Sequence, residues 1–241
     1  MSFPLFTVTI LYDNRTIQDD LLPSHGFSCM VENDRGKKVL FDTGESGPLL
    51  LANMQRLGID ASTIEKVVLS HEHYDHVGGL ISLLANRIDI EIFILPSFST
   101  AFRKKILDLN GDLKEVSEGM EILPGLFSTG EVVGAINEQG LVVVGKEKAL
   151  FIGGCCHPGL ERMVSTASQV AGQPVGGVMG GLHLCQSEDE EIESQLQNLK
   201  KLGVDRIAPC HCTGFTGMDM ARDIWDSGYF TTGVGMKLEW E

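Results

Sequence analysis

The chain has 241 residues, of which 43% are hydrophobic and 22% are charged, and its formal net charge is −14. This composition is typical of a globular protein, and no apolar run approaches the roughly 20 residues needed to span a bilayer. The negative charge argues against non-specific nucleic-acid binding, because such binding depends on cationic side chains that displace counterions from phosphates. We therefore expect neither nucleic acid nor a membrane among its partners.

The length and the N-terminus indicate how the chain is organised. Chains of α/β type with roughly 200 to 250 residues often form one domain. We therefore expect a single domain over residues 1–241. Residues 1–10 alternate apolar and polar side chains and no basic residue precedes Arg15, so we expect no cleaved export signal and a cytoplasmic location. The six cysteines are then expected to be reduced thiols or residues near a metal.

The first half of the chain predicts strands and helices joined by turn-rich segments. The expected strands are residues 5–11, 27–31, 38–41, 66–70 and 90–95. Helices are expected where Leu50, Met54 and Leu57 recur at helical spacing, and also over residues 80–84 and 100–107. Gly58 is expected to end the first of these helices, because glycine readily adopts the left-handed conformation found after a helix.

The second half predicts a further group of strands and two long helices. The expected strands are residues 120–127, 141–144, 149–152, 175–179 and 204–208. One helix is opened by Pro158 and carries an apolar stripe over residues 160–170. The other begins at a capping box formed by Ser187 and Glu190, and Gly203 ends it. Two strand-rich halves with later helices predict an α+β fold of the αββα sandwich type.

The segment richest in chemical groups is residues 71–76, which reads HEHYDH and follows an apolar, β-branched strand. Neutral imidazoles and a carboxylate suit zinc or another borderline divalent ion, and His71 and His73 can reach one ion from an irregular backbone. Asp75 and His76 can then face a second ion. The alternative is a solvated loop that happens to be rich in histidine. Gly78-Gly79 favours the metal site, since glycines allow close approach of the chain and a helix start.

Three later histidines follow expected strands, at positions where loops often carry function. His157 comes after strand 149–152, beside the start of a helix, and His211 comes between two cysteines after strand 204–208. Both are interpreted as metal ligands rather than as ordinary buried imidazoles. His183 has two open interpretations, either a substrate-facing group or acid catalyst, or an interior histidine.

The pattern His-x-His-x-Asp-His after a hydrophobic strand resembles the signature of the metallo-β-lactamase fold superfamily. Asp42-Thr43-Gly44 resembles the strand-ending Asp-Thr-Gly of that superfamily, and the later histidines follow its order. Within the superfamily, the chain is most similar to the subgroup of dihydropterin-methyl-ribofuranosylaminobenzene phosphate synthase-like proteins. The segments that carry this likeness are residues 25–28 (HGFS), 154–159 (GCCHPG), 180–184 (GGLHL) and 210–214 (CHCTG).

The resemblance implies a metallo-β-lactamase type αββα sandwich with zinc as the cofactor, as two ions, and with iron or manganese as alternatives. The implied ligands of the first ion are His71, His73 and His157. The implied ligands of the second ion are Asp75, His76 and His211. The residues expected to orient a ligand or line the pocket are Asp42, His25 and Cys156. Asp75 and His183 are the implied catalytic residues, with Asp75 helping to fix the attacking water.

The chain departs from the family pattern at one place. Many hydrolytic members have an aspartate that bridges two metals after the strand corresponding to residues 149–153, whereas this chain has Cys155 and Cys156. A thiolate at this place could coordinate zinc, and a small neutral packing residue is an equal alternative. The sequence therefore leaves a fully occupied two-metal site open.

The activity implied by the resemblance is that of a metal-dependent hydrolase, in which metal-activated water attacks an ester, amide or phosphoester. A first alternative is transfer chemistry of the synthase subgroup. A second is a non-enzymatic metal-binding or redox-sensing protein that uses the cysteines Cys155, Cys156, Cys210 and Cys212. The expected partner is a small-molecule substrate, and homodimer formation is left open.

Overall fold

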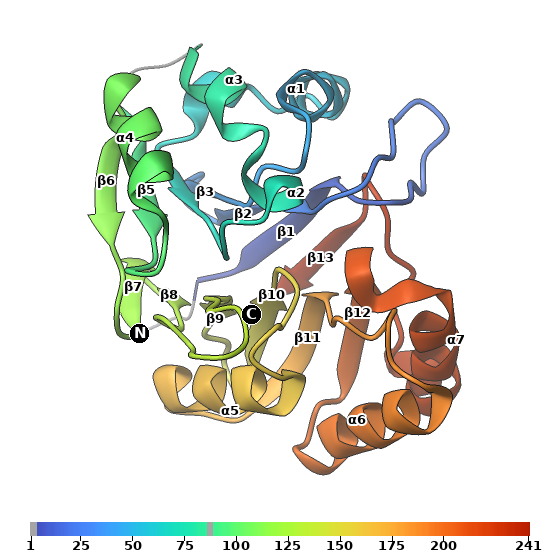
Figure 1. Ribbon diagram of the computed structural model, residues 1–241. Coiled ribbons are helices and arrows are strands. Elements are labelled where there is room, and N and C mark those ends of the chain that lie inside the picture. The colour runs from blue at the N-terminus through green and yellow to red at the C-terminus, as the bar shows by residue number, and fades with distance from the viewer. Residues whose placement is uncertain (1–3, 86–88) are drawn as a thin grey trace. The chain divides into compact units, whose positions relative to one another are not determined.

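The computed structural model describes residues 4–85 and 89–241, which form two compact units (Figure 1). The N-terminal unit comprises residues 5–117 and 233–239, and the C-terminal unit comprises residues 118–232 with residues 4 and 240–241. Residues 1–3 of the alternating N-terminal segment lie outside the described residues. Each unit is built on one β-sheet. The single domain over the whole chain stays a prediction.

The N-terminal unit contains a seven-stranded sheet with the order β13-β1-β2-β3-β4-β5-β6. Its strands are β1 (Phe6–Tyr12), β2 (Ser28–Asn33), β3 (Lys38–Phe41), β4 (Lys66–Val68), β5 (Glu91–Ile94), β6 (Asp112–Glu115) and β13 (Lys237–Trp240). Strands β1, β2 and β3 pair antiparallel, whereas β3, β4, β5 and β6 are all parallel. The carboxyl ends of β3 and β4 therefore open at the same edge, and the segments that follow them meet there.

The helices of this unit pack their apolar faces around the sheet, and α1 lies beside α3 (Figure 1). They are α1 (Gly47–Arg56), the 3₁₀ turn η1 (Ala61–Thr63), α2 (Tyr74–Val77), α3 (Leu80–Ala85) and α4 (Thr100–Asp108). Leu50 and Met54 of α1 are buried against Leu40 and Val67 of the sheet in one apolar cluster. Full burial of such side chains stabilises the fold by about 1.5–3 kcal/mol each.

The C-terminal unit contains a six-stranded sheet with the order β12-β11-β10-β9-β8-β7. Its strands are β7 (Met120–Leu123), β8 (Leu126–Ser128), β9 (Leu141–Val143), β10 (Ala149–Gly153), β11 (Val175–Gly181) and β12 (Arg206–Cys210). Strands β7 to β10 pair antiparallel, and β10, β11 and β12 are parallel. Three neighbouring strands thus end at one edge of this sheet.

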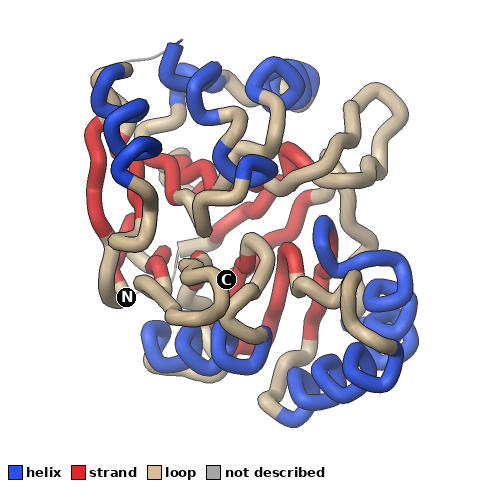
Figure 2. Tube along the Cα trace, in the orientation of Figure 1, coloured by secondary structure: helices blue, strands red, loops and turns tan. Residues whose placement is uncertain are grey.

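Helices of the C-terminal unit cover its sheet with one apolar cluster that includes Phe151, Met163, Leu196 and Trp225. They are α5 (Leu160–Ala171), α6 (Asp189–Lys201), α7 (Gly214–Trp225) and the 3₁₀ turns η2 (His211–Thr213) and η3 (Asp226–Gly228). Figure 2 shows that loops join these helices and strands, including the long connection over residues 129–140 between β8 and β9. The predicted site residues that follow strands lie in such connections.

Most predicted elements are confirmed, but two predictions are wrong. The strand expected over residues 120–127 is a hairpin of β7 and β8, because Pro124-Gly125 turns the chain and Gly125 has φ 84°. The predicted capping box does not form, since Glu188 is the N-terminal cap of α6 and makes no side-chain cap hydrogen bond.

Several elements were not predicted, among them β6, α7 and β13. Strand β6 has the sequence DLKE and lies at the sheet edge with no buried residue, so it shows no apolar alternation. Helix α7 contains two glycines, which weaken a helical signal, and β13 is a short C-terminal strand.

All six cysteines lie among the described residues and are free thiols, as predicted. Within residues 4–85 and 89–241, no helix is both long and apolar enough to cross a membrane.

Asn53 connects α1 to the loop that follows β1, and this connection gives a first prediction. Its buried side chain donates hydrogen bonds to the carbonyls of Leu11 (3.0 Å) and Leu22 (2.9 Å), and it accepts one from the Leu22 N–H (2.9 Å). Because Asn53→Ala leaves these backbone groups without their partner, we expect it to lower the free energy of unfolding by about 2 kcal/mol in urea titrations.

The matched control is Gln55→Ala, which changes an exposed side chain on the same helix. We expect its effect to stay within about 0.5 kcal/mol. Equal losses in the two variants would contradict the role given to Asn53.

Candidate metal centre

Three imidazoles of the N-terminal unit gather where β4 ends. The ring centroid of His71 lies 4.5 Å from that of His73 and 4.3 Å from that of His76. His71 and His76 are buried, and His73 is exposed. The irregular backbone expected here is only partly present, because His73 is the N-terminal cap of the short helix α2 and His76 lies within it. A helical turn thus brings His76 back beside His71.

Asp42, which follows β3, fixes two of these rings, that of His76 directly and that of His71 through Ser70. The Asp42 carboxylate accepts hydrogen bonds from Ser70 N and Ser70 Oγ, both at 2.7 Å, and its Oδ2 lies 2.7 Å from His76 Nδ1. Ser70 Oγ also lies 2.9 Å from His71 Nδ1. Because the hydroxyl proton goes to the carboxylate, His71 Nδ1–H must donate to Ser70. Both rings therefore carry their proton on Nδ1, so that a metal would bind through Nε2.

The Asp-Thr-Gly loop also holds the backbone of the histidine segment. Thr43 donates two hydrogen bonds to the His76 carbonyl, from its N–H (2.7 Å) and its hydroxyl (2.9 Å). Gly79 N–H donates to the Gly44 carbonyl at 3.0 Å. A Cβ atom on Gly79 would lie 2.2 Å from the Thr43 carbonyl oxygen, so a larger residue does not fit. The close approach predicted for this glycine is confirmed.

Asp75 lies between two imidazoles of the same unit. Its Oδ2 atom is 3.2 Å from His25 Nε2 and 3.7 Å from His76 Nε2. The Asp75 carbonyl accepts the Phe27 N–H at 3.2 Å, and Gly26, at φ 130°, allows the loop to approach this closely. The His25 side chain itself is largely exposed. The catalytic role of Asp75 and the pocket role of His25 remain predictions.

In the C-terminal unit, the segments after β10, β11 and β12 share one sheet edge. Each contains a non-glycine residue with positive φ, namely Cys156 (65°), His183 (52°) and His211 (49°). In the N-terminal unit, Asp42 has the same unusual conformation, with φ 55°. Such backbone costs of order 1–3 kcal/mol per residue and tends to cluster where function requires it. This clustering makes the strand ends a candidate functional site.

Side chains of these three segments form two overlapping donor groups. The ligand atoms of Cys155, His211 and Cys212 lie within 4.8 Å of one another, as do those of Cys155, His157 and His183. The ring centroids of His157 and His183 are 4.2 Å apart.

The vicinal cysteines point to different places. Cys155 belongs to both donor groups, whereas Cys156 belongs to the apolar cluster of this unit. Burial, together with the charge of Glu138, raises the pKa of the Cys156 thiol well above its usual value. Cys156 therefore behaves as the neutral packing residue, and Cys155 offers sulfur to the donor groups.

Cys212 and His183 are in contact, and the N–H of this contact is the backbone N–H of His183. His183 N–H donates to Cys212 Sγ at 3.3 Å. Burial raises the pKa of Cys212, but hydrogen bonds with Cys155 and His183 and the charge of His211 bring it well below its usual value. A hydrogen bond with Cys212 is the main cause that raises the pKa of His183, against burial. These directions are those of a thiolate beside a protonated imidazole.

Glu138 is a site residue that the sequence did not reveal. Its carboxylate is fully buried and accepts the backbone N–H groups of Cys155 (2.8 Å), Cys156 (2.9 Å) and His157 (2.9 Å). Burial raises the Glu138 pKa to about 7, although these three hydrogen bonds act in the opposite direction. The residue lies in a polar loop whose sequence has no recognisable motif, so only the fold identifies it.

The donor atoms of the two units fit a borderline divalent metal such as zinc, since imidazole and thiolate are its preferred ligands. The structure brings His71, His73 and His76 together in the N-terminal unit and His157, His183 and His211 together with Cys155 in the C-terminal unit. Each predicted ligand set combines residues from both units, so the sets stay a prediction.

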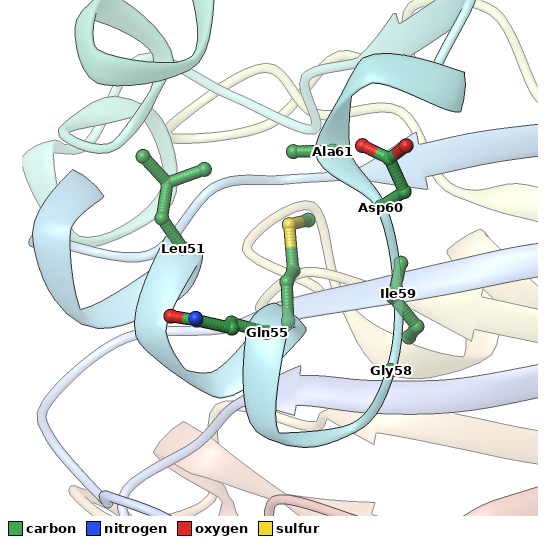
Figure 3. Close-up of a pocket in the computed structure, with 7 residues that line it drawn as sticks. Leu51, Gln55, Gly58, Ile59, Asp60 and Ala61 are labelled. Atoms are coloured by element: carbon green, nitrogen blue, oxygen red, sulfur yellow. The ribbon is translucent and has the colours of Figure 1, made fainter.

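A hollow in the N-terminal unit lacks this chemistry (Figure 3). It is lined by Leu51, Met54, Gln55, Gly58, Ile59, Asp60 and Ala61. Asp60 is the one ionisable residue among these, and its Oδ1 accepts the Ser62 N–H at the start of η1. We assign this hollow no part in the chemistry.

Comparison with known proteins identifies the family of this chain. Residues 22–157 match the Metallo-beta-lactamase superfamily. The chain is 32% identical, over 81% of its length and 83% of the relative, to 7,8-dihydropterin-6-methyl-4-(beta-D-ribofuranosyl)-aminobenzene-5'-phosphate synthase of Methanocaldococcus jannaschii. This chain therefore belongs to the metallo-β-lactamase superfamily.

Solved structures confirm the predicted fold. The crystal structure of Tm1679, a metal-dependent hydrolase of the beta-lactamase superfamily, matches 97% of this chain and 98% of its own, with TM-score 0.77 and 29% identity. Zn(2+)-bound PqqB from Methylobacterium extorquens matches 96% of this chain and 99% of its own, with TM-score 0.65. Its identity is only 15%, so this second likeness concerns the fold alone.

The Asp42 network gives a second prediction. Asp42→Asn keeps the size of the side chain and tolerates the positive φ, but it removes the charged acceptor of the His76 Nδ1–H bond. We expect zinc affinity, measured by competition with a chelator, to fall by about 10- to 100-fold. Asp89→Asn is the control, because Asp89 is exposed and also has positive φ (76°). Unchanged affinity in Asp42→Asn would contradict the positioning role.

Glu138 gives a third prediction. In Glu138→Gln, the amide NH₂ group replaces one carboxylate oxygen, so one of the three backbone N–H donors faces another donor. We expect the free energy of unfolding, measured by denaturant titration, to fall by about 2 kcal/mol. Glu147→Gln, in an exposed turn, is the control and should change little. If the two variants unfold at the same denaturant concentration, the three hydrogen bonds do not stabilise the loop.

Proposed function

We propose that this chain is a metal-dependent hydrolase that uses metal-activated water on a small ester, amide or phosphoester substrate. Its superfamily and its named relative indicate an enzyme. The single observation that carries the proposal is the hydrogen-bond network of Asp42, which contacts His76 directly and His71 through Ser70. It keeps the protons of both rings on Nδ1, and this supports Nε2 as the atom that would bind a metal.

The metal proposed here is zinc, as two ions, with His157 and His211 completing the ligand sets expected from the resemblance. When bound, the metal supplies a water of lowered pKa and polarises the substrate oxygen. Asp42 holds the proton of His76 on Nδ1 and thereby keeps the ring oriented.

In this proposal, one further residue orients the attacking water and another donates a proton. Asp75, whose Oδ2 lies 3.7 Å from His76 Nε2, orients the attacking water by accepting its hydrogen bond. His183, whose ring lies 4.2 Å from that of His157, donates the proton that the leaving group needs.

The test is a panel of ester, amide and phosphoester substrates, assayed with protein stripped by a chelator and then supplied with zinc. We expect turnover only in the zinc-supplied protein. His71→Ala should lose both turnover and bound metal, because it removes an imidazole ligand. Glu72→Gln is the matched control within the same motif, since the Glu72 carboxylate accepts hydrogen bonds from Ser99. It should keep both properties, and retention of both in His71→Ala would refute the assignment.

A second candidate is a synthase of the kind that the Methanocaldococcus jannaschii relative is named for. It is favoured by 32% identity over most of both chains, which is higher than the identity to the hydrolase structure reported above. The same metal-loaded protein should be incubated with the two substrates of that synthase. Formation of the named product without turnover of the hydrolase panel would replace the hydrolase proposal.

A further inference from the structure

We propose that Cys155 and Cys212 bind the metal as thiolates, so that the centre is a mixed imidazole–thiolate site selective for thiophilic divalent ions. The proposal rests on the proposed function only in requiring a bound metal. Both cysteines lie in the C-terminal unit together with His211, and the three ligand atoms are within 4.8 Å of one another. Two sulfurs and one imidazole nitrogen this close together can supply three of the four ligands of a tetrahedral zinc site.

Cys155 has a special place because two donor groups share it. Its sulfur also lies within 4.8 Å of the ligand atoms of His157 and His183. Of these two histidines, His157 is the proposed metal ligand and His183 keeps its proposed role as proton donor. Because Cys155 lies beside one proposed ligand of each ion, His211 and His157, its thiolate is placed to bridge them.

The backbone around Cys155 is held in one conformation. Glu138 accepts the N–H groups of three successive residues, beginning with Cys155 at 2.8 Å. Cys156 takes positive φ, and its side chain packs on Gly153, where a Cβ atom would lie 2.7 Å from Cys156 Sγ. Because the buried carboxylate and the packed Cys156 fix the loop on both sides, the position of Cys155 is well determined.

Cys212 is held by three contacts. Its Sγ donates to the Cys155 carbonyl at 3.8 Å, a hydrogen bond that is lost when the thiol gives up its proton to bind a metal. A Cβ atom on Gly181 would lie 2.7 Å from Cys212 Sγ, so glycine makes room for the sulfur at the end of β11. His183 N–H donates to the same sulfur at 3.3 Å. A backbone N–H that donates to a metal-bound sulfur stabilises its negative charge and helps to orient the ligand.

The two sulfurs determine the class of metal. Thiolates favour zinc and iron, whereas magnesium, calcium and manganese favour oxygen ligands. We therefore expect zinc or ferrous iron to bind much more tightly than manganese.

The experiment uses cobalt(II) as a spectroscopic substitute for zinc in the full-length protein after chelator treatment. Thiolate coordination produces a sulfur-to-cobalt charge-transfer band in the near ultraviolet. We expect this band to weaken in Cys155→Ser and in Cys212→Ser and to be lost in the double variant. The matched control is Cys185→Ser, which changes an exposed thiol outside both donor groups. This control should keep the band.

A second measurement needs no variant and so does not depend on how well the serine variants fold. Alkylation of each thiol in the wild-type protein is followed by peptide mass spectrometry with and without zinc. Zinc should slow alkylation of the partly exposed Cys212 several-fold and should leave the exposed Cys185 unaffected. Equal alkylation of Cys212 in both conditions would overturn the proposal.

The outcomes separate this proposal from the proposed function. Cobalt binding without a charge-transfer band, or with a band that survives in the double variant, overturns thiolate ligation and leaves the hydrolase proposal standing. A band with the expected cysteine dependence but without turnover of the substrate panel supports the site and rejects the hydrolase. Failure to bind any cobalt overturns both.

Discussion

The hydrogen bonds of the buried Asp42 carboxylate are the interaction on which the N-terminal site depends. Asp42 is fully buried, and a carboxylate in such a place is tolerated only when its oxygens are satisfied by donors. The parallel pairing of β3 with β4 brings Ser70 and His76 to it, and these residues supply the donors. The requirement to satisfy Asp42 therefore fixes the rings of the histidine segment, so that stability and site geometry are determined by the same contacts.

In the C-terminal unit, a buried carboxylate also orders a loop through its hydrogen bonds. There the buried carboxylate is Glu138, and its donors are three successive backbone N–H groups of the loop after β10. Asp42 fixes the side chains of His71 and His76. Glu138 instead fixes the backbone of the segment that contains Cys155 and His157. In both units, parallel strands end at one sheet edge and a buried carboxylate orders the loop that follows. Strained residues such as His183 and His211 are tolerated beside these ordered loops.

The sequence predicted the histidine segment, the Asp42 motif and most strands because their signals are local. A buried strand followed by clustered imidazoles is visible in a few adjacent residues, and so is the spacing of Leu50 and Met54 on α1. Glu138 was not predictable, since it lies 17 residues before Cys155 and only the fold brings them together. The choice between Cys155 and Cys156 was open for the same reason, because only the folded loop after β10 brings Cys155 to the donor groups and Cys156 to the apolar cluster. Helix α7 was missed because its glycines weaken the helical pattern.

The buried carboxylates also explain why a metal would stabilise this acidic chain. Asp42 holds the His76 proton on Nδ1, so a cation on Nε2 would act through the ring on a buried negative charge and compensate it. The coupling is reciprocal, because a carboxylate that makes the imidazole a better ligand is itself stabilised when the ligand binds a cation. A formal net charge of −14 adds to this attraction for cations. Metal binding and folding of the strand-end loops should therefore favour each other, since the same buried charges govern both.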